Sequence, residues 1–327
     1  MENVYDIAVI VINYNNAGYT IECVQSLMEK STSELSVQYI IVDNSSEMED
    51  FQTLKAFTEQ LDHPNLILFR SQLNGGFGAG NMHGVQWANA KYYAFINNDT
   101  LMIDDCLKHC FRFMEITPEA AVCGPQIRID QKRQARSFGH FISLPKIMFG
   151  NTLIESGAFG RKPSRKKEYA APVEVDYVNG SFMFFRAEDF HKVGGFDTNI
   201  FLFYEESDIC YRLKKQGRST WYLPGARYIH FEGSSHKAPI AIKKELKMSM
   251  LYVLRKNRGY LNFLVARYFL VIRYFFSTLV KPKYFPLLKA CITGNYITDS
   301  LKQQQVIHKE KAGVYTCMPK TTDRQIS

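Results

Sequence analysis

The chain has 327 residues, of which 46% are apolar and 22% charged, an ordinary composition for a globular protein with one large α/β domain or two smaller ones. Its seven cysteines form no CxxC pair and no Cys/His zinc spacing, and the N-terminus lacks a basic signal-peptide region, so a reducing cytoplasm is expected. The net charge of +8 is concentrated in residues 237–289, which hold twelve Lys or Arg and one acidic residue. The basic character therefore belongs to the C-terminal tail and not to the body.

Short apolar runs alternate with segments of helical periodicity over roughly the first hundred residues. The runs at 7–12, 37–42, 66–69 and 92–96 predict strands, with helices between them. Such alternation requires parallel strands joined by right-handed crossovers, so we expect an α/β fold with a doubly wound sheet.

Three of these strands end in polar clusters. In parallel sheets ligands bind at the carboxyl ends of the strands, and those ends meet at one edge. We therefore expect these clusters to form a binding site together: Asn13-Tyr14-Asn15, Asp43-Asn44-Ser45 and Asn97-Asn98-Asp99.

The pattern is less regular beyond residue 100. Periodicity is lost between 130 and 172, where a basic patch at 161–167 indicates either a mobile loop over the site or a solvated surface loop. The other expected elements of the body are a helix after Asp104 and Asp105, strands at 121–124, 173–186 and 227–230, and a helix at 202–215.

Several polar residues in this frame can carry chemistry, although each also has a structural explanation. The Asp43 carboxylate can accept a hydrogen bond from N3–H of uracil or thymine, or it can cap a helix or form an Asx turn. Asp99 can bind a divalent cation that bridges two phosphates, or it can belong to a polar turn.

The glycine-rich stretch 74–80 does not fit a dinucleotide-binding motif. The G-x-G-x-x-G spacing would need glycine where the chain has Asn81 or His83, and the stretch follows the third strand and not the first. It predicts a loop whose backbone approaches a ligand closely, followed by a helix N-terminus suited to anionic groups.

The segment 204–208 places three carboxylates at the expected start of a helix. They can stabilise the helix dipole, or one of them can be a general base that takes a proton from an acceptor hydroxyl. His230 ends a strand and either completes a metal site, contacts a phosphate or is structural.

Taken in sequence order, these stretches resemble the motifs of family 2 glycosyltransferases, especially the bacterial rhamnosyltransferase-like branch. The resemblance covers about residues 5–236 and implies a GT-A fold and an inverting mechanism. It implies a nucleotide-sugar site made of Asn13, Tyr14, Asn15, Asp43, Asn44, Asn74, Gly76, Gly78, Asn97 and Asn98, with Asp43 reading a pyrimidine. It also implies a Mg²⁺ or Mn²⁺ ion held by Asp99 and His230, and a general base, Glu206, supported by Glu205 and Asp208.

The chain departs from this branch at two positions. The paired acids usually read Glu-Asp, whereas this chain has Glu205-Glu206, and the turn that corresponds to the D-x-D motif begins with Asn97 instead of Asp. The first departure bears on the geometry of the base and the second on metal dependence.

The tail combines basic residues with a bulky apolar segment at 259–280. Arg267 and Arg273 interrupt this segment, and central arginines cost about 2.5–3.5 kcal/mol each on insertion scales, which argues against a transmembrane span. We expect an interfacial helix on an anionic membrane, with a helical subdomain packed on the body as the alternative. No nucleic-acid-binding motif is present, so nucleic acid is not an expected partner.

The sequence thus predicts a GT-A domain at 1–236 and a basic, aromatic helical tail at 237–327. By resemblance, the expected reaction transfers L-rhamnose from dTDP-rhamnose to a hydroxyl of a glycan or lipid-linked glycan in bacterial surface polysaccharide synthesis, on the cytoplasmic face of the cell membrane. The alternatives are transfer of galactofuranose or N-acetylhexosamine from a UDP-sugar, a non-catalytic sugar-nucleotide-binding subunit, and a nicotinamide-dependent oxidoreductase, against which the glycine spacing argues.

Overall fold

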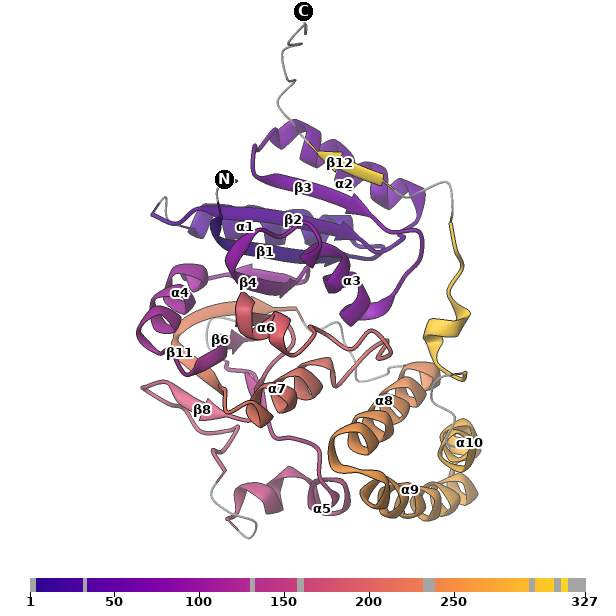
Figure 1. The fold of residues 1–327 in the computed structure, drawn as a ribbon. Coiled ribbons are helices and arrows are strands. Elements are labelled where there is room, and N and C mark those ends of the chain that lie inside the picture. The colour runs from indigo at the N-terminus through magenta and orange to yellow at the C-terminus, as the bar shows by residue number, and fades with distance from the viewer. Residues whose placement is uncertain are drawn as a thin grey trace, which may run out of the picture.

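The strands expected in the first hundred residues form the parallel half of one sheet, in the order β3-β2-β1-β4 (Figure 1). They are β1 (Tyr5–Asn13), β2 (Val37–Asp43), β3 (Leu66–Arg70) and β4 (Ala90–Asn97), and the helices between them are α1 (Ala17–Lys30), α2 (Met48–Leu61) and α3 (Gly76–Val85). The computed structural model describes residues 4–31, 34–129, 133–157, 162–231, 239–293, 298–308 and 313–316. The predicted α/β fold with a mostly parallel, doubly wound sheet is confirmed.

The second half of the sheet mixes directions. Beyond β4 the order continues β10-β6-β11-β5, with β10 antiparallel to both of its neighbours and β8 paired to β11. These strands are β5 (Thr100–Met102), β6 (Ala120–Arg128), β8 (Val173–Val175), β10 (Phe182–Arg186) and β11 (Ser219–His230). The single strand expected at 173–186 is divided, because Tyr177–Val178 (β9) leaves the main sheet to pair with Phe138–Gly139 (β7).

Helices cover both faces of the sheet. One buried cluster joins the sheet to α1, α2 and α4 (Cys106–Ile116), with Leu27, Leu54 and Cys110 at its centre. A second cluster joins the other face to α3, α6 (Ala187–Lys192) and α7 (Glu205–Lys215). Because both faces are buried, the central strands are apolar along their whole length.

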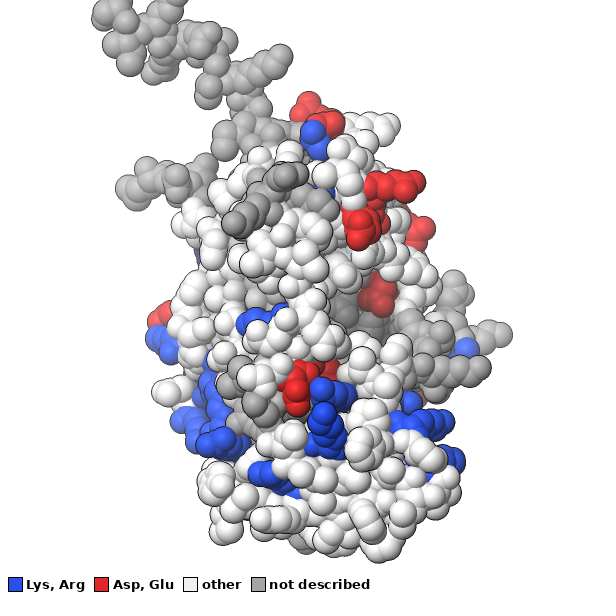
Figure 2. Space-filling model, turned by 90° about the vertical axis from the view of Figure 1, so that its right-hand side faces the viewer, with Lys and Arg blue, Asp and Glu red and all other residues white. Residues whose placement is uncertain are grey.

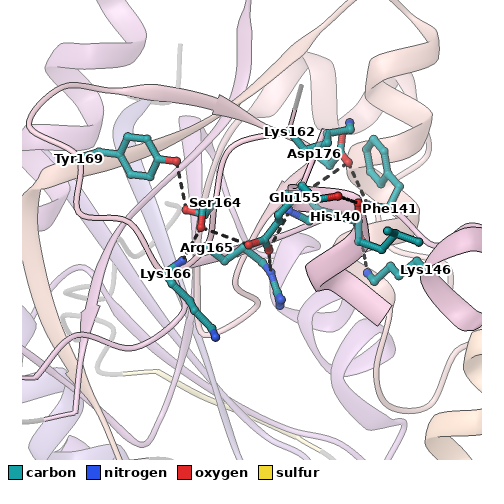
Figure 3. A network of polar contacts seen from close by, with 12 residues as sticks. His140, Phe141, Lys146, Glu155, Lys162, Ser164, Arg165, Lys166, Tyr169 and Asp176 are labelled. Carbon is teal, nitrogen blue, oxygen red and sulfur yellow. Dashed lines mark hydrogen bonds and ion pairs between the residues drawn. The ribbon is translucent and has the colours of Figure 1, made fainter. Parts of the chain in front are cut away.

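The expectation of an irregular loop between 130 and 172 is wrong for Leu144–Glu155, which forms α5 with a kink at Gly150. Ser143 caps this helix, and two of the downstream basic residues, Lys162 and Arg165, form ion pairs, whereas Lys166 and Lys167 are exposed (Figure 3). Arg165 Nε donates to Glu155 Oε1 at 2.6 Å, and Lys162 Nζ donates to Asp176 Oδ1 at 2.7 Å. Arg161 of the basic patch lies outside the described residues.

The tail packs against the body. Its elements are α8 (Ile240–Arg258), α9 (Tyr260–Val280), the 3₁₀ turns η2 (Pro282–Tyr284) and η3 (Leu301–Gln304), α10 (Phe285–Thr293) and β12 (Gly313–Thr316). Helices α8, α9 and α10 share a buried cluster that also includes Ile142 and Ile200 of the body. The expected boundary after residue 236 falls within 232–238, outside the described residues.

The tail also returns to the sheet at its far edge. Strand β12 pairs antiparallel with β3, so the last described residues lie beside the first third of the chain (Figure 1). The sequence predicts only helices in the tail, because the four residues of this strand carry too little pattern to mark one.

Candidate active site

The polar ends of β1, β2 and β4 lie on one edge of the sheet, as expected. Asn13 pairs in register with Asp43, and Ile12 with Asn97. The Asn13 amide donates to Asp43 Oδ1 at 3.0 Å, and Asn98 Nδ2 donates to Thr20 Oγ1 at 3.0 Å. Side chains from three strand ends thus form one connected polar layer.

Asp43 is fully buried within this layer. Its Oδ2 lies 3.5 Å from Nε of Arg70, a residue that the sequence analysis did not single out, and accepts from Ser46 N–H at 3.3 Å. Burial raises the pKa of the Asp43 carboxyl, against the lowering effects of Ser46, Asn13 and Arg70. The Arg70 guanidinium also stacks over the ring of Phe51 at 3.9 Å.

The glycine-rich segment wraps closely around Asn44. The Asn44 amide donates to Asn74 Oδ1 at 2.9 Å and accepts from Gly75 N–H at 3.2 Å. Gly76 begins α3 with φ +80°, and a Cβ there would lie 2.1 Å from the carbonyl oxygen of Phe201. Only glycine therefore fits at position 76, which brings the 201 loop against the start of α3.

A cavity of about 600 Å³ opens beside this edge. Of the predicted site residues, it is lined by Tyr14, Asn44, Asn74, Gly76, Asn97, Asn98 and Asp99. The other predicted site residues do not line this cavity: Asn13, Asn15, Asp43, Gly78, Glu205, Glu206, Asp208 and His230. Asn15 has φ 53° and its Oδ1 accepts from Glu47 N–H, while a Cβ on Gly78 would lie 3.8 Å from Glu205 Cγ.

The lining residues that the sequence analysis missed are mostly apolar or come from the tail. They are Ile12, Asn16, Tyr19, Phe77, Phe201, Leu202, Phe231, Ile242, Leu301 and Gln305. The rings of Tyr19 and Phe231 stack with centroids 6.0 Å apart. No local pattern marks Leu301 or Gln305, since they reach the cavity only because the tail returns to the body.

Asp99 and His230 come together at the rim of the cavity. Strand β11 pairs with β5 so that His230 lies opposite Thr100, and His230 Nε2 is 3.2 Å from Asp99 Oδ1. The His230 Nδ1 atom is buried with no hydrogen-bond partner. Imidazole and carboxylate are both ligands of divalent transition metals, so these two residues suit such an ion.

Within the described ranges, no group of three or more His, Cys, Asp and Glu side chains could hold a metal ion alone. One or two protein ligands are nevertheless enough where substrate phosphates complete the coordination of an ion such as Mg²⁺. Asp99 and His230 therefore fit a cation that binds together with a diphosphate.

The paired acids begin α7 after two residues with left-handed backbone, Phe203 (φ 74°) and Tyr204 (φ 72°). Glu205 is buried, and its Oε1 has no hydrogen-bond partner. Burial, and then the charge of Glu206, raise the pKa of Glu205 well above its usual range. Burial also raises the pKa of Glu206, while Lys146 opposes that rise. A carboxyl with a raised pKa suits general base catalysis near neutral pH.

Glu206 lies near the turn that follows β9. A Cβ on Gly180 would be 3.9 Å from Glu206 Oε2, and the carbonyl of the next residue, Ser181, accepts from Asn97 N–H at 3.0 Å. Glu206 is therefore one short turn away from the end of β4.

Asp208 is placed as an anchor of the tail. Its Oδ2 accepts from Arg212 Nε and Lys256 Nζ, each at 2.9 Å, and its Oδ1 accepts from Asn257 Nδ2 at 3.2 Å. Because it is fully buried and bonded on both oxygens, Asp208 holds α8 against α7.

These features match known proteins. A sequence model of the family described as Glycosyl transferase family 2 matches residues 8–194, more than half of the chain. The chain belongs to glycosyl transferase family 2. It is therefore a glycosyltransferase and not the nicotinamide-dependent oxidoreductase that was the alternative.

Individual relatives of this family 2 glycosyltransferase include two rhamnosyltransferases. The chain is 28% identical over 193 residues to "Rhamnosyltransferase WbbL" of Escherichia coli K12, covering 56% of this chain and 71% of that protein. It is 30% identical over 124 residues to the "N-acetylglucosaminyl-diphospho-decaprenol L-rhamnosyltransferase" of Mycobacterium tuberculosis, covering 36% of this chain and 39% of that protein.

Solved structures confirm the GT-A fold of this glycosyltransferase. The mannosyltransferase PcManGT from Pyrobaculum calidifontis, in complex with GDP-Man and Mn²⁺, matches with a TM-score of 0.54 and 14% identity, over 91% of this chain and 88% of that one. GalNAc-T7 with UDP, GalNAc and Mn²⁺ matches with a TM-score of 0.58 and 14% identity, over 78% of this chain and 48% of that one.

Proposed function

We propose that this enzyme transfers a sugar from a pyrimidine diphosphate sugar to an acceptor hydroxyl, with inversion at the anomeric carbon. The observation that carries the proposal is the Asp99–His230 pair beside a cavity at the edge where β1, β2 and β4 end. A cation held by these two residues supplies charge stabilisation to the departing diphosphate. The Mn²⁺ in both structural neighbours supports this role.

The nucleotide occupies the cavity against Tyr14 and the amides of Asn44 and Asn74. Asp43 acts from beneath this layer, since it orders Asn13 and the 43–46 turn and is screened by Arg70. Direct contact of Asp43 with the base, as the family resemblance implies, would require a small opening of this turn.

Glu206 is the proposed general base. It takes the proton of the acceptor hydroxyl as that oxygen bonds to the anomeric carbon, and the bond between this carbon and the diphosphate oxygen breaks with its electron pair leaving on the nucleotide. Glu205 is its proposed support: it is buried beside Glu206, and burial together with the charge of Glu206 raises the pKa of Glu205, which disfavours two carboxylates side by side.

The preferred donor is dTDP-L-rhamnose, and the names of the two bacterial rhamnosyltransferases support rhamnose as the transferred sugar. A UDP-sugar, with galactofuranose or N-acetylhexosamine as the transferred group, is the second candidate. The UDP found in one structural neighbour favours it.

The proposed acceptor is a lipid-linked glycan, as the name of the mycobacterial relative indicates for that protein. Helix α9 is long and apolar enough to cross a membrane by length and composition, yet one face of it packs on α8 and α10. The other face exposes an apolar stripe at helical spacing: Leu261, Val265, Tyr268, Ile272, Phe276 and Leu279. We infer peripheral docking of this stripe on the inner face of the cell membrane, as a soluble surface rarely exposes such a patch.

The experiment that tests the proposal is thermal stabilisation of the purified protein by dTDP-, UDP- and GDP-sugars, with and without Mn²⁺. A ligand that binds only the folded state raises Tm according to its binding free energy. Stabilisation by dTDP-rhamnose with Mn²⁺, followed by its turnover, supports the proposal. Turnover of another donor with none of dTDP-rhamnose would refute the donor, and nucleotide binding without any turnover would favour a non-catalytic subunit.

A further inference from the structure

A second, smaller cavity of about 160 Å³ lies where α5, α8 and α9 meet. Three cations from three different helices face it, Lys146, Lys247 and Arg273. The remaining lining residues are Ile142, Ile147, Asn151, Tyr204, Met250 and Leu270. The cavity therefore has a positive polar side and an apolar side.

No acidic side chain lines this cavity, and none forms an ion pair with its three cations within the part of the chain that the structure describes, although the charges of Glu206 and Asp176 act on Lys146. Lys146 Nζ donates to the carbonyl of His140 (Figure 3). Burial, and then the charge of Arg273, lower the pKa of Lys247. Like charges held together in a half-buried space repel each other, and a bound anion would reverse that repulsion.

Asn151, which also lines this cavity, has an unsatisfied side-chain atom. The Oδ1 atom of Asn151 is buried with no hydrogen-bond partner. A rotation of about 180° around the Cβ–Cγ bond exchanges the amide oxygen for the NH₂ group, and that group would add a hydrogen-bond donor to the three cations.

The cavity lies between the proposed base and the apolar stripe of α9. On one side Tyr204 directly precedes the paired acids, and the charges of Lys146 and Glu206 interact. On the other side Arg273 adjoins Ile272, whose side chain is 60% exposed. Figure 2 shows blue Lys and Arg side chains above a lower surface that is almost entirely white.

We infer that Lys146, Lys247 and Arg273 bind the phosphate group of a lipid-linked acceptor. The phosphate in this cavity sets the depth of the acceptor, so that its sugar hydroxyl extends to Glu206 and its apolar chain leaves along α9. Arginine offers a planar fork for phosphate oxygens, and lysine adds a point charge. This inference rests on the proposed function, because it assigns the acceptor side of that same site.

The test compares the double variant Lys247→Gln/Arg273→Gln with a charge-matched control, Lys243→Gln/Lys289→Gln, whose lysines are exposed on α8 and α10. The probe is farnesyl diphosphate, a soluble prenyl diphosphate, titrated into the full chain by calorimetry. Loss of two charge-assisted contacts should weaken its binding by about tenfold or more, while the control stays near wild type. A dTDP-sugar titrated in parallel should bind all three proteins equally.

Two further probes separate the sources of the phosphate. Inorganic pyrophosphate should bind to wild type more weakly than farnesyl diphosphate does. The affinity for phosphatidylglycerol vesicles should fall by a similar factor in the two double variants, relative to wild type. Unchanged farnesyl diphosphate binding in Lys247→Gln/Arg273→Gln would overturn the inference, as would equal losses in variant and control. Loss of vesicle binding alone would also overturn it, because the cations would then serve membrane headgroups. Failure of wild type to bind any nucleotide sugar would instead count against the proposed function.

Discussion

His230 and Asp99 lie 3.2 Å apart, from Nε2 to Oδ1, although they come from opposite ends of the body. The pairing of β11 with β5 brings them together, and both side chains are largely shielded, with 12% and 25% exposed. His230 ends β11, and Asp99 lies in the short turn between β4 and β5, so neighbouring strands position both residues. This favours a fixed pair of metal ligands at the cavity rim.

Replacing Asp99 with Asn should lower kcat by about 100-fold or more, because charge stabilisation of the departing diphosphate is worth several kcal/mol. The measurement is turnover as a function of Mn²⁺ concentration, with chelation by EDTA as the limiting case. Asp104→Asn is the matched control. Asp104 Oδ2 lies 2.7 Å from Arg227 Nε, and neither residue lines the cavity. Full activity of wild type in EDTA would contradict the metal role.

Glu206→Gln should lower kcat by about 10²- to 10⁴-fold with donor affinity unchanged, because only proton transfer is lost. Glu206→Asp, which restores the Glu-Asp pair usual in this branch, should retain more activity than the Gln variant. The base acts when deprotonated, and burial raises its pKa, so the acidic limb of the rate profile should lie above pH 4.5. Equal kcat in wild type and Glu206→Gln would exclude this residue as the base.

Glu205→Gln should make the protein more stable at neutral pH relative to wild type. The pKa of Glu205 in the folded state is raised above the ordinary 4.5, so its favourable protonated form is fully present below that pH. Wild type then loses stability as pH rises through the interval between the two pKa values, by up to about 1.4 kcal/mol per pH unit. Urea unfolding from pH 4 to 8 should show this slope in wild type and in an exposed control, Glu29→Gln, and a smaller slope in Glu205→Gln, where only the raised pKa of Glu206 remains.

Arg70→Met should destabilise the fold by about 3–5 kcal/mol, since it leaves the buried Asp43 carboxylate without its cation. The double variant Asp43→Asn/Arg70→Met should recover part of this loss, because the unpaired charge is then gone. Urea denaturation of the two single variants and the double variant measures the coupling. Strictly additive effects would mean that the pair contributes nothing as a pair.

Ile272→Glu should release the protein from vesicles of anionic lipid, because it places a charge in the exposed stripe of α9. Ile116→Glu is the control, since Ile116 is 82% exposed at the end of α4 and belongs to a different surface. Co-sedimentation with phosphatidylglycerol vesicles measures the difference. Equal release of both variants, or of neither, would argue against docking through α9.

The sheet and its polar edge were predictable because they follow from local pattern. Asn13, Asp43 and Asn97 each end an apolar strand, and parallel pairing alone places them together. The His230–Asp99 pair depends on an antiparallel contact between distant strands, so only the family resemblance suggested it. Its metal role, like the roles of Glu205 and Glu206, stays a prediction.

The parts that sequence reasoning missed depend on tertiary contacts. The sequence places Arg70 only at the end of a strand, before a turn. The structure shows that its buried guanidinium packs on the ring of Phe51 and lies beside the Asp43 carboxylate. Leu301 and Gln305 carry no periodic signal, yet they reach the cavity because Glu245 of α8 accepts hydrogen bonds from Ser300 Oγ and Leu301 N–H. Long-range contacts of this kind leave no local trace in composition or spacing.

Strand β12 protects the edge of the sheet from association between copies of this chain. It occupies the outer side of β3, where Ile67 to Arg70 would otherwise present open backbone N–H and C=O groups. An open edge of that kind recruits strands from other chains. A fragment cut after residue 236 would lose β12 along with the helices, and it should self-associate through β3 where the whole chain does not.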